Sequence, residues 1–186
     1  MIRRFLSLLL LSMLAVACAT MPVTTDPRLS TTTLDAYRLD SGDKLRITVF
    51  GQADLTAEYN IDSSGRVAVP LIDPVSARGQ TTDQFAHSLE TALGEKLLRN
   101  PSVSVEVTQY RPFFILGEVN QPGQYAYVNG MTVKTAAAIA GGFTYRASTA
   151  GVTITRRMDD AMFEGTATID APIMPGDTIT VAERLF

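Results

Sequence analysis

An alternation of apolar and polar residues begins after Tyr37 and predicts strands. Leu45, Ile47 and Val49 alternate with polar residues, which is the period of two that turns every second side chain to the same face of a sheet. The same reasoning predicts three further strands in this half of the chain, at Glu58–Ile61, Arg66–Leu71 and Val103–Val107. Residues 62–65, Asp-Ser-Ser-Gly, predict the turn between the first two of these.

A period close to four replaces the alternation between Thr81 and Arg99 and predicts a helix. Its apolar face consists of Phe85, Leu89, Leu93 and Leu97. Thr81 and Gln84 fit a capping box at the start of the helix. Asn100-Pro101 is expected to end it, because the residue before a proline avoids the helical conformation.

Arg111-Pro112 marks the expected boundary to a second half with similar patterns. Apolar or alternating runs predict strands at Phe113–Val119, Gln124–Val128, Val152–Arg156, Phe163–Ile169 and Thr178–Val181. The alanine-rich stretch Thr132–Ala140 predicts a short helix, with Gly141-Gly142 as its C-terminal cap.

These elements predict an α+β fold of two small strand-rich modules. We expect the first module at residues 36–110 and the second at residues 111–186. Modules of this size, about 75 residues, bury only a limited core. We therefore expect them to pack on each other or on neighbouring subunits.

Two nine-residue stretches resemble each other. Leu39–Ile47 and Ile173–Val181 both place a Gly-Asp pair in a turn just before an alternating strand. Glycine permits unusual backbone angles, and aspartate can accept hydrogen bonds from nearby amides. A recurring turn device explains the similarity, and an internal duplication is the alternative.

Residues 1–17 have the pattern of an export signal. Arg3 and Arg4 precede an apolar run from Phe5 to Ala17, which is shorter than the roughly 20 residues that a membrane-spanning helix needs. We expect this signal peptide to be removed. Lys plus Arg then falls from 16 to 14 against 19 acidic residues, so the mature chain, 169 of the 186 residues, would carry a charge of −5.

The single cysteine, Cys18, directly follows this signal. Residues 14–18, Leu-Ala-Val-Ala-Cys, resemble a bacterial lipobox, in which the cysteine becomes the acylated N-terminus. Two or more acyl chains, such as palmitate, make a stable membrane anchor. An ordinary signal peptide with an incidental cysteine is the alternative.

The residues after Cys18 predict where the protein is sorted and how it is tethered. Ala19 favours sorting to the outer membrane. Residues 18–35, rich in threonine, are expected to form a flexible tether.

Composition and motifs narrow the possible chemistry. A pI of about 5.1 argues against nucleic-acid binding. One cysteine and one histidine exclude a disulfide framework and a cysteine-built zinc site. That histidine, His87, faces away from the apolar stripe of its helix, and Asp159-Asp160 beside two arginines indicates a charged hairpin tip. We therefore expect no enzyme, no cofactor and no metal site.

The stretch from Tyr37 onward resembles the polysaccharide export outer-membrane lipoproteins, the Wza-like family. The first module resembles the family's export domain over residues 37–47, 62–65 and 100–105. The second resembles a β-grasp module called SLBB over residues 117–119, 121–125, 130–133 and 140–143. Each motif alone has low specificity, but their order behind a lipobox is specific.

The resemblance implies a ring-shaped homo-oligomer in the periplasm that works with an inner-membrane polysaccharide co-polymerase. It also implies a role as a conduit. Larger relatives carry a C-terminal pore helix, whereas here Phe186 follows the last predicted strand by five residues. This chain therefore resembles the short members, for which a separate outer-membrane β-barrel protein would supply the pore.

The sequence thus predicts an outer-membrane-anchored, periplasm-facing ring component of a polysaccharide export machine, forming a passive conduit without a high-affinity pocket. The alternative is a monomeric carbohydrate-binding lipoprotein of the cell envelope. In that case the aromatic residues of the second module, such as Tyr125 and Tyr127, would stack on sugar rings. Core packing is the competing use of these side chains.

Overall fold

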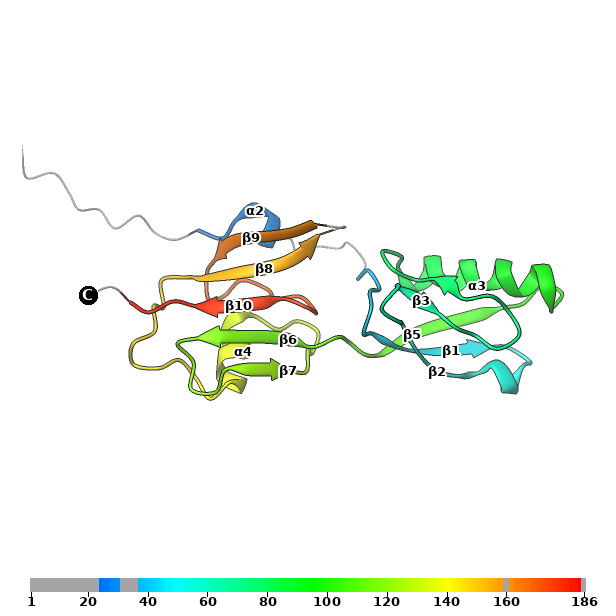
Figure 1. Ribbon diagram of the computed structural model, residues 1–186, viewed down its shortest axis with the longest axis horizontal. Coiled ribbons are helices and arrows are strands. Elements are labelled where there is room, and N and C mark those ends of the chain that lie inside the picture. Colours follow the sequence, from blue (N-terminus) through cyan, green and yellow to red (C-terminus); the bar gives the residue numbers. More distant parts are fainter. Residues whose placement is uncertain (1–23, 31–36, 159–160, 185–186) are drawn as a thin grey trace, which may run out of the picture.

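The computed structural model describes residues 24–30, 37–158 and 161–184 of the chain. The signal peptide, Cys18 and Asp159-Asp160 lie outside the described residues. The two modules lie one after the other along the long axis of the molecule (Figure 1). Each consists of a sheet with one helix against it, so the predicted α+β class and the two-module arrangement are confirmed.

The first module is a three-stranded antiparallel sheet in the order β2-β1-β5, with α3 packed on it. The strands are β1 (Lys44–Val49), β2 (Ala57–Asn60) and β5 (Val103–Gln109), and α3 spans Thr82–Lys96. A short 3-10 helix, η2 (Ala53–Leu55), connects β1 to β2. The predicted capping box of α3 is present, because the Thr81 hydroxyl accepts from the Gln84 amide while the Gln84 side chain accepts from the Thr81 amide.

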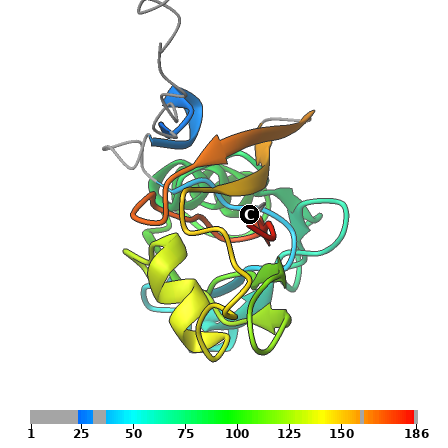
Figure 2. The same ribbon diagram turned by 90° about the vertical axis from the view of Figure 1, so that its left-hand side faces the viewer.

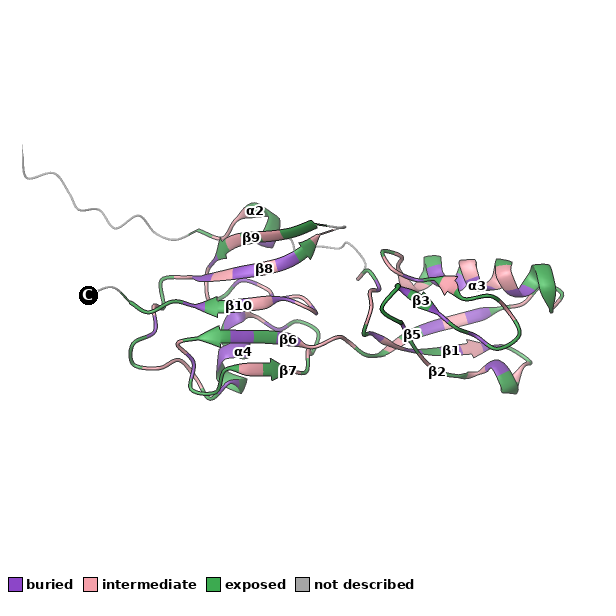
Figure 3. Ribbon diagram, viewed as in Figure 1, coloured by how far each residue is buried: buried purple, intermediate pink, exposed green. Residues whose placement is uncertain are grey.

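The core of this module lies between α3 and the sheet. Phe85, Leu89 and Leu93 of the helix are fully buried against Leu45 and Ile47 of β1. Figure 3 shows the resulting stripe of buried residues along the inner side of α3. Leu97, predicted on the same apolar face, is 42% exposed because it follows the last helical turn.

One predicted strand is shorter than expected. Of Arg66–Leu71, only β3 (Arg66–Val67) forms, paired with β4 (Val75–Ser76), which the sequence pattern did not predict. Pro70 carries no amide hydrogen to donate, and Leu71 adopts a positive φ of 71° and is 73% exposed. Both features end the pairing.

The second module is a mixed five-stranded sheet in the order β7-β6-β10-β8-β9. Its strands are β6 (Phe113–Gly117), β7 (Gly123–Tyr125), β8 (Val152–Met158), β9 (Ala161–Ala167) and β10 (Thr178–Val181). The central strand β10 runs parallel to β6 and antiparallel to β8. Helix α4 (Val133–Ile139) covers one face of this sheet.

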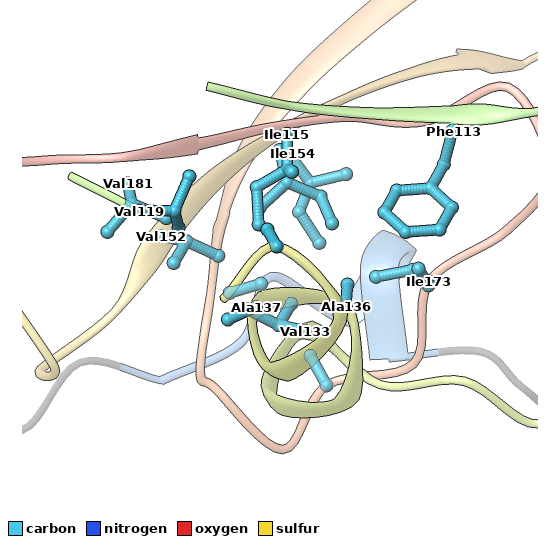
Figure 4. Close-up of a cluster of buried hydrophobic side chains, with 14 of the residues drawn as sticks. Phe113, Ile115, Val119, Val133, Ala136, Ala137, Val152, Ile154, Ile173 and Val181 are labelled. Atoms are coloured by element: carbon cyan, nitrogen blue, oxygen red, sulfur yellow. The ribbon is translucent and has the colours of Figure 1, made fainter. Parts of the chain in front are cut away.

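Alternate residues of the central strands point toward α4 and form the core. Figure 4 shows Ile115 of β6 and Ile154 of β8 directed at the helix that carries Ala136 and Ala137, while Phe113 of β6 points to the same side of the sheet, toward Ile173. The small alanine side chains let the helix approach the sheet closely. The opposite face has no covering element among the described residues, and Phe114 and Leu116 are 39% and 45% exposed there.

The N-terminal segment differs from its prediction. We expected residues 18–35 to be a flexible tether, but residues 24–30 dock on the second module, where α2 (Pro27–Ser30) lies beside β9 (Figures 1 and 2). The Asp26 amide donates to the Thr166 carbonyl over 2.8 Å, and Leu29 is fully buried in the core of that module. The burial of Leu29 overrides the polar composition that predicted a tether. The chain therefore contributes to the second module both before and after it builds the first.

Candidate functional site

The two Gly-Asp turns recognised in the sequence lie at the junction between the modules and share one geometry. The amides of Asp43 and Asp177 each donate to a carbonyl three residues earlier, both over 3.2 Å. Each carboxylate accepts in return from the amide of that earlier residue, over 3.0 Å at Asp43 and 2.7 Å at Asp177. Gly42 and Gly176 have φ of 93° and 84°, values that favour glycine.

Both aspartates are completely buried, and each is paired with an arginine. Arg156 binds Asp177 in a bidentate manner, with Nε to Oδ1 at 2.9 Å and Nη2 to Oδ2 at 2.8 Å. Arg111 binds Asp43 through its backbone amide at 2.9 Å and its Nη1 at 3.3 Å. The Tyr37 hydroxyl also donates to Asp43 over 2.6 Å. Buried carboxylates require such partners, because a lone buried charge is very costly.

Arg111 connects the two turns. It belongs to the short segment between β5 and β6, and its side chain lies close enough to Gly176 that an added Cβ there would be 2.7 Å from Arg111 Nε. The neighbouring Pro112 carbonyl accepts from the Gly176 amide over 3.1 Å. The Asp177 carbonyl in turn accepts from the Phe114 amide over 2.8 Å. These two backbone bonds fix the second turn to the start of the second module, and the contacts of Arg111 with Asp43 join that module to the first.

A chain of aromatic rings reinforces this junction. Tyr37 and Tyr110 meet edge to face with centroids 4.9 Å apart, and Tyr110 and Tyr127 do so at 5.6 Å. These distances fall in the favourable range for aromatic pairs. Burial raises the pKa of Tyr37 well above that of a free tyrosine and also raises the pKa of Tyr127.

An arginine-rich cleft opens beside the junction. It has a volume of about 300 Å³ and is lined by residues of both modules. We call it the arginine cleft, because six of its lining residues are arginines: Arg28, Arg38, Arg78, Arg111, Arg156 and Arg157. A smaller hollow of about 200 Å³ shares four lining residues with it, Asp40, Arg111, Arg157 and Pro175. The cleft was not predicted, because its arginines come from six separate positions in the sequence.

Four of these arginines have a carboxylate partner. Besides the two buried pairs, Arg78 Nε binds Asp40 Oδ1 over 2.9 Å. Arg28 lies 3.7 Å from Asp26 and 4.2 Å from the centre of the Phe163 ring.

The pKa values of Asp40, which lines the cleft, and of the buried Asp177 beside it shift in opposite directions. Burial would raise the pKa of Asp40, but the Ser41 amide and the Arg78 guanidinium donate to its carboxylate and hold the pKa below its ordinary value. For Asp177, burial outweighs Arg156 and raises the pKa.

The remaining two arginines, Arg38 and Arg157, have no carboxylate partner among the described residues. Arg38 donates to the Gly79 carbonyl over 2.7 Å. Arg157, near the end of β8, is exposed and has no partner among the described residues. A guanidinium carries five N–H donors, so both retain donors that can bind an anion.

The other residues singled out in the sequence lie away from this cleft or outside the described residues. His87 is exposed on α3, with its Nδ1 3.0 Å from the Asp83 carbonyl oxygen. Gly141 ends α4 as predicted, with a φ of 80°. Tyr125 stacks on Phe113 with centroids 5.9 Å apart and is half-buried.

Neither a metal-ligand cluster nor a membrane-spanning helix occurs in the part of the chain that the structure describes. No group of three or more metal-ligating side chains comes together there. None of the described helices has the length and apolarity needed to cross a membrane.

Comparison with known proteins agrees with the two-module architecture. Residues 31–108 match the family described as "Polysaccharide biosynthesis/export protein", and residues 112–167 match the SLBB domain. The chain is 36% identical over 121 residues to the exopolysaccharide production protein ExoF of Rhizobium meliloti, covering 58% of this chain and 28% of the relative.

A second relative is less similar in sequence. The polysialic acid transport protein KpsD of Escherichia coli is 24% identical over 108 residues, covering 57% of this chain and 19% of the relative. The chain thus spans less than a third of the length of either curated relative. The two family matches follow each other in order and cover 78 and 56 residues, together 134 of the 186. The chain therefore belongs to the Wza-like polysaccharide export protein family, with an export domain followed by an SLBB domain.

Proposed function

We propose that this protein is a periplasmic ring component of a polysaccharide export machine, anchored in the outer membrane through acylated Cys18. Identical subunits would enclose a polar conduit through which a hydrated polymer passes without covalent chemistry. An inner-membrane co-polymerase and a separate outer-membrane pore protein would complete the path. The observation that carries the proposal is an export domain followed directly by an SLBB domain, with Arg111 and Asp43 in contact at their junction.

In a closed ring, the junction between the modules would fix the orientation of each subunit. Subunits close into a ring only if each presents its two contact surfaces at a fixed angle. The buried pair of Arg111 and Asp43 and the chain of tyrosines join the two modules and restrain the angle between them. The uncovered sheet face, with Phe114 and Leu116 exposed, offers apolar surface to a neighbouring subunit.

The alternative, a monomeric binder that uses Tyr125 and Tyr127 as a platform, has less support. Both rings are half-buried and packed against the core of the second module. Tyr125 also donates its hydroxyl to the Gln121 carbonyl over 2.6 Å. Rings engaged in this way have little free face on which a sugar could stack.

Deletion and complementation test the proposal. Cells lacking the gene should lose extracellular polysaccharide, and the wild-type gene should restore it. Cys18→Ala should abolish labelling by radioactive palmitate, release the protein from the outer membrane and reduce export. Ser12→Ala, which leaves the lipobox unchanged, is the matched control. Normal extracellular polysaccharide in the deletion strain would contradict the proposal.

The ring is tested separately on the full chain extracted from membranes in mild detergent. Mass measurement should give one closed oligomer rather than a monomer. Leu116→Asp, on the exposed sheet face, should dissociate it, whereas Val128→Asp, at a position 64% exposed in a loop, should not. A wild-type protein that remains monomeric in membranes under crosslinking would favour the carbohydrate-binding alternative.

A further inference from the structure

The arginine cleft has an excess of positive charge in an acidic protein. Its six arginines contact four carboxylates, those of Asp26, Asp40, Asp43 and Asp177. Two positive charges therefore remain uncompensated among the described residues, which leave out Asp159 and Asp160. The whole chain has a formal charge of −3. A local charge opposite in sign to that of the whole protein indicates attraction of an anion.

The two unpaired arginines come from different modules. Arg38 lies just before the first Gly-Asp turn, and Arg157 lies near the end of β8. Both line the cleft of about 300 Å³, a size at the lower end of the range for small-molecule sites. Planar guanidinium groups suit carboxylate and phosphate oxygens, which they bind in a bidentate manner.

The rest of the lining favours a sugar over a simple ion. Met158, Met174 and Pro175 present apolar surface in the same cleft, and Tyr37 also lines it. A sugar ring alternates apolar C–H faces with polar groups, so it matches a lining that mixes apolar atoms with cation donors. A small inorganic anion would gain nothing from the apolar part.

We propose that the arginine cleft binds a carboxylate-bearing sugar unit of the polymer that the protein exports, with Arg38 and Arg157 contacting the carboxylate. This inference rests on the proposed function, because it names the class of substrate. Both arginines are exposed, so screening by water and salt keeps the binding weak. Weak binding is compatible with a polymer that must move on.

The test titrates the purified full chain, held in a neutral detergent, with tri-galacturonate. The matched probe is its fully methyl-esterified form, which has the same size and no charge. Tri-galacturonate should bind saturably at low salt. Binding should disappear when the salt concentration approaches about 1 M, where the Debye length is only about 3 Å. Equal binding of the ester, or no binding of tri-galacturonate at low salt, would overturn the inference.

Variants locate the site. Arg38→Gln combined with Arg157→Gln should weaken the binding of tri-galacturonate about tenfold or more, since each change removes a charge-assisted hydrogen bond. The control Arg99→Gln combined with Arg46→Gln removes the same charge from exposed positions that do not line the cleft and should leave the affinity unchanged. Equal weakening by both pairs would mean a diffuse charge effect and would refute the assignment.

Two further results separate this inference from its rivals. If hexaglutamate binds as tightly and displaces tri-galacturonate, the cleft recognises an acidic peptide and the sugar assignment fails. In cells, a double variant that exports normally in a strain whose deletion abolishes export refutes the cleft assignment but leaves the proposed function standing. Normal export in the deletion strain refutes the proposed function whatever the cleft binds.

Discussion

Arg111 holds Asp43 by two different groups, its backbone amide over 2.9 Å and its guanidinium over 3.3 Å. The aspartate is completely buried at the start of β1, while the arginine lies between β5 and β6. The same side chain lies against Gly176 of the second turn. One residue thereby links the Gly-Asp turns of both modules, and the junction depends on it.

Replacing Arg111 by methionine should therefore destabilise the whole protein. Arg111→Met keeps an apolar stem but leaves the Asp43 carboxylate buried without its cation. Loss of one partner of a buried pair costs about 3 kcal/mol, measurable by urea denaturation. Arg46→Met, at an exposed position on β1, should change the free energy of unfolding by less than about 0.5 kcal/mol. Similar effects of the two changes would contradict this role.

The pair of Arg156 and Asp177 should behave as a coupled unit. Arg156→Met leaves the buried Asp177 carboxylate without its cation, and Asp177→Asn leaves the buried Arg156 guanidinium without its anion. Each change should therefore lower the free energy of unfolding by about 3 to 5 kcal/mol. The double variant should cost clearly less than the sum of the two, since no unpaired charge remains. Strict additivity in this double-mutant cycle would show that the two side chains do not interact.

Alanine at Gly176 should cost more than alanine at Gly130. Both glycines have a positive φ, 84° and 83°, so both substitutions carry the same backbone strain of about 1 to 2 kcal/mol. A Cβ at Gly176 would also collide with the Arg111 side chain at 2.7 Å, whereas a Cβ at Gly130 meets nothing within 4 Å. The difference in unfolding free energy between the two variants measures the cost of displacing Arg111. No difference would mean that Arg111 moves aside freely.

Leu29→Ala should detach the N-terminal segment from the second module. Leu29 is fully buried beside β9, and a large-to-small change at such a site costs about 2 kcal/mol or more. Hydrogen exchange of the Asp26 amide, which donates to Thr166, should accelerate in the variant. Val128→Ala, at a position 64% exposed, is the control and should leave that exchange rate unchanged.

The ion pair of Asp40 and Arg78 should contribute to acid sensitivity. The folded protein holds the pKa of Asp40 below its ordinary value of 3.8. A lowered folded pKa stabilises the protein at pH above the unfolded value, and this stabilisation is lost as the pH falls through the folded pKa. The stability difference between wild type and Asp40→Asn should therefore shrink as the pH drops below about 4.

The control for this pH dependence is Asp54→Asn. Asp54 is exposed and makes no ion pair within the described parts of the chain. Its replacement removes the same charge as Asp40→Asn without breaking an ion pair, so it serves as the reference for the pH profile. Urea denaturation between neutral and acid pH compares the two variants, and parallel curves for both would refute the contribution of Asp40.

Most local structure was predictable because it depends on neighbouring residues. The alternation at Leu45–Val49 and the period of four at Phe85–Leu93 correspond to β1 and α3. The capping box at Thr81 depends on a residue only three positions away. Where a prediction failed, a local exception or a distant contact was the cause: Leu71 with its positive φ ended a strand, and Leu29 found a distant core.

The candidate site was only partly predictable. The similarity of the two Gly-Asp stretches was visible in the sequence, but their burial and their meeting at Arg111 were not. The six arginines of the cleft are spread from residue 28 to residue 157. No periodicity in the sequence relates side chains at such separations, because only packing between the modules brings them together.

The sequence by itself determined the two modules, the helices α3 and α4, most of the strands and the family resemblance, since these follow from short-range patterns. The tertiary structure alone decided that residues 24–30 complete the second module. It also decided that Asp43 and Asp177 are buried with arginine partners and that Arg38 and Arg157 share one cleft without such partners. The physical reason is that burial and charge pairing depend on which distant segments exclude water from one another.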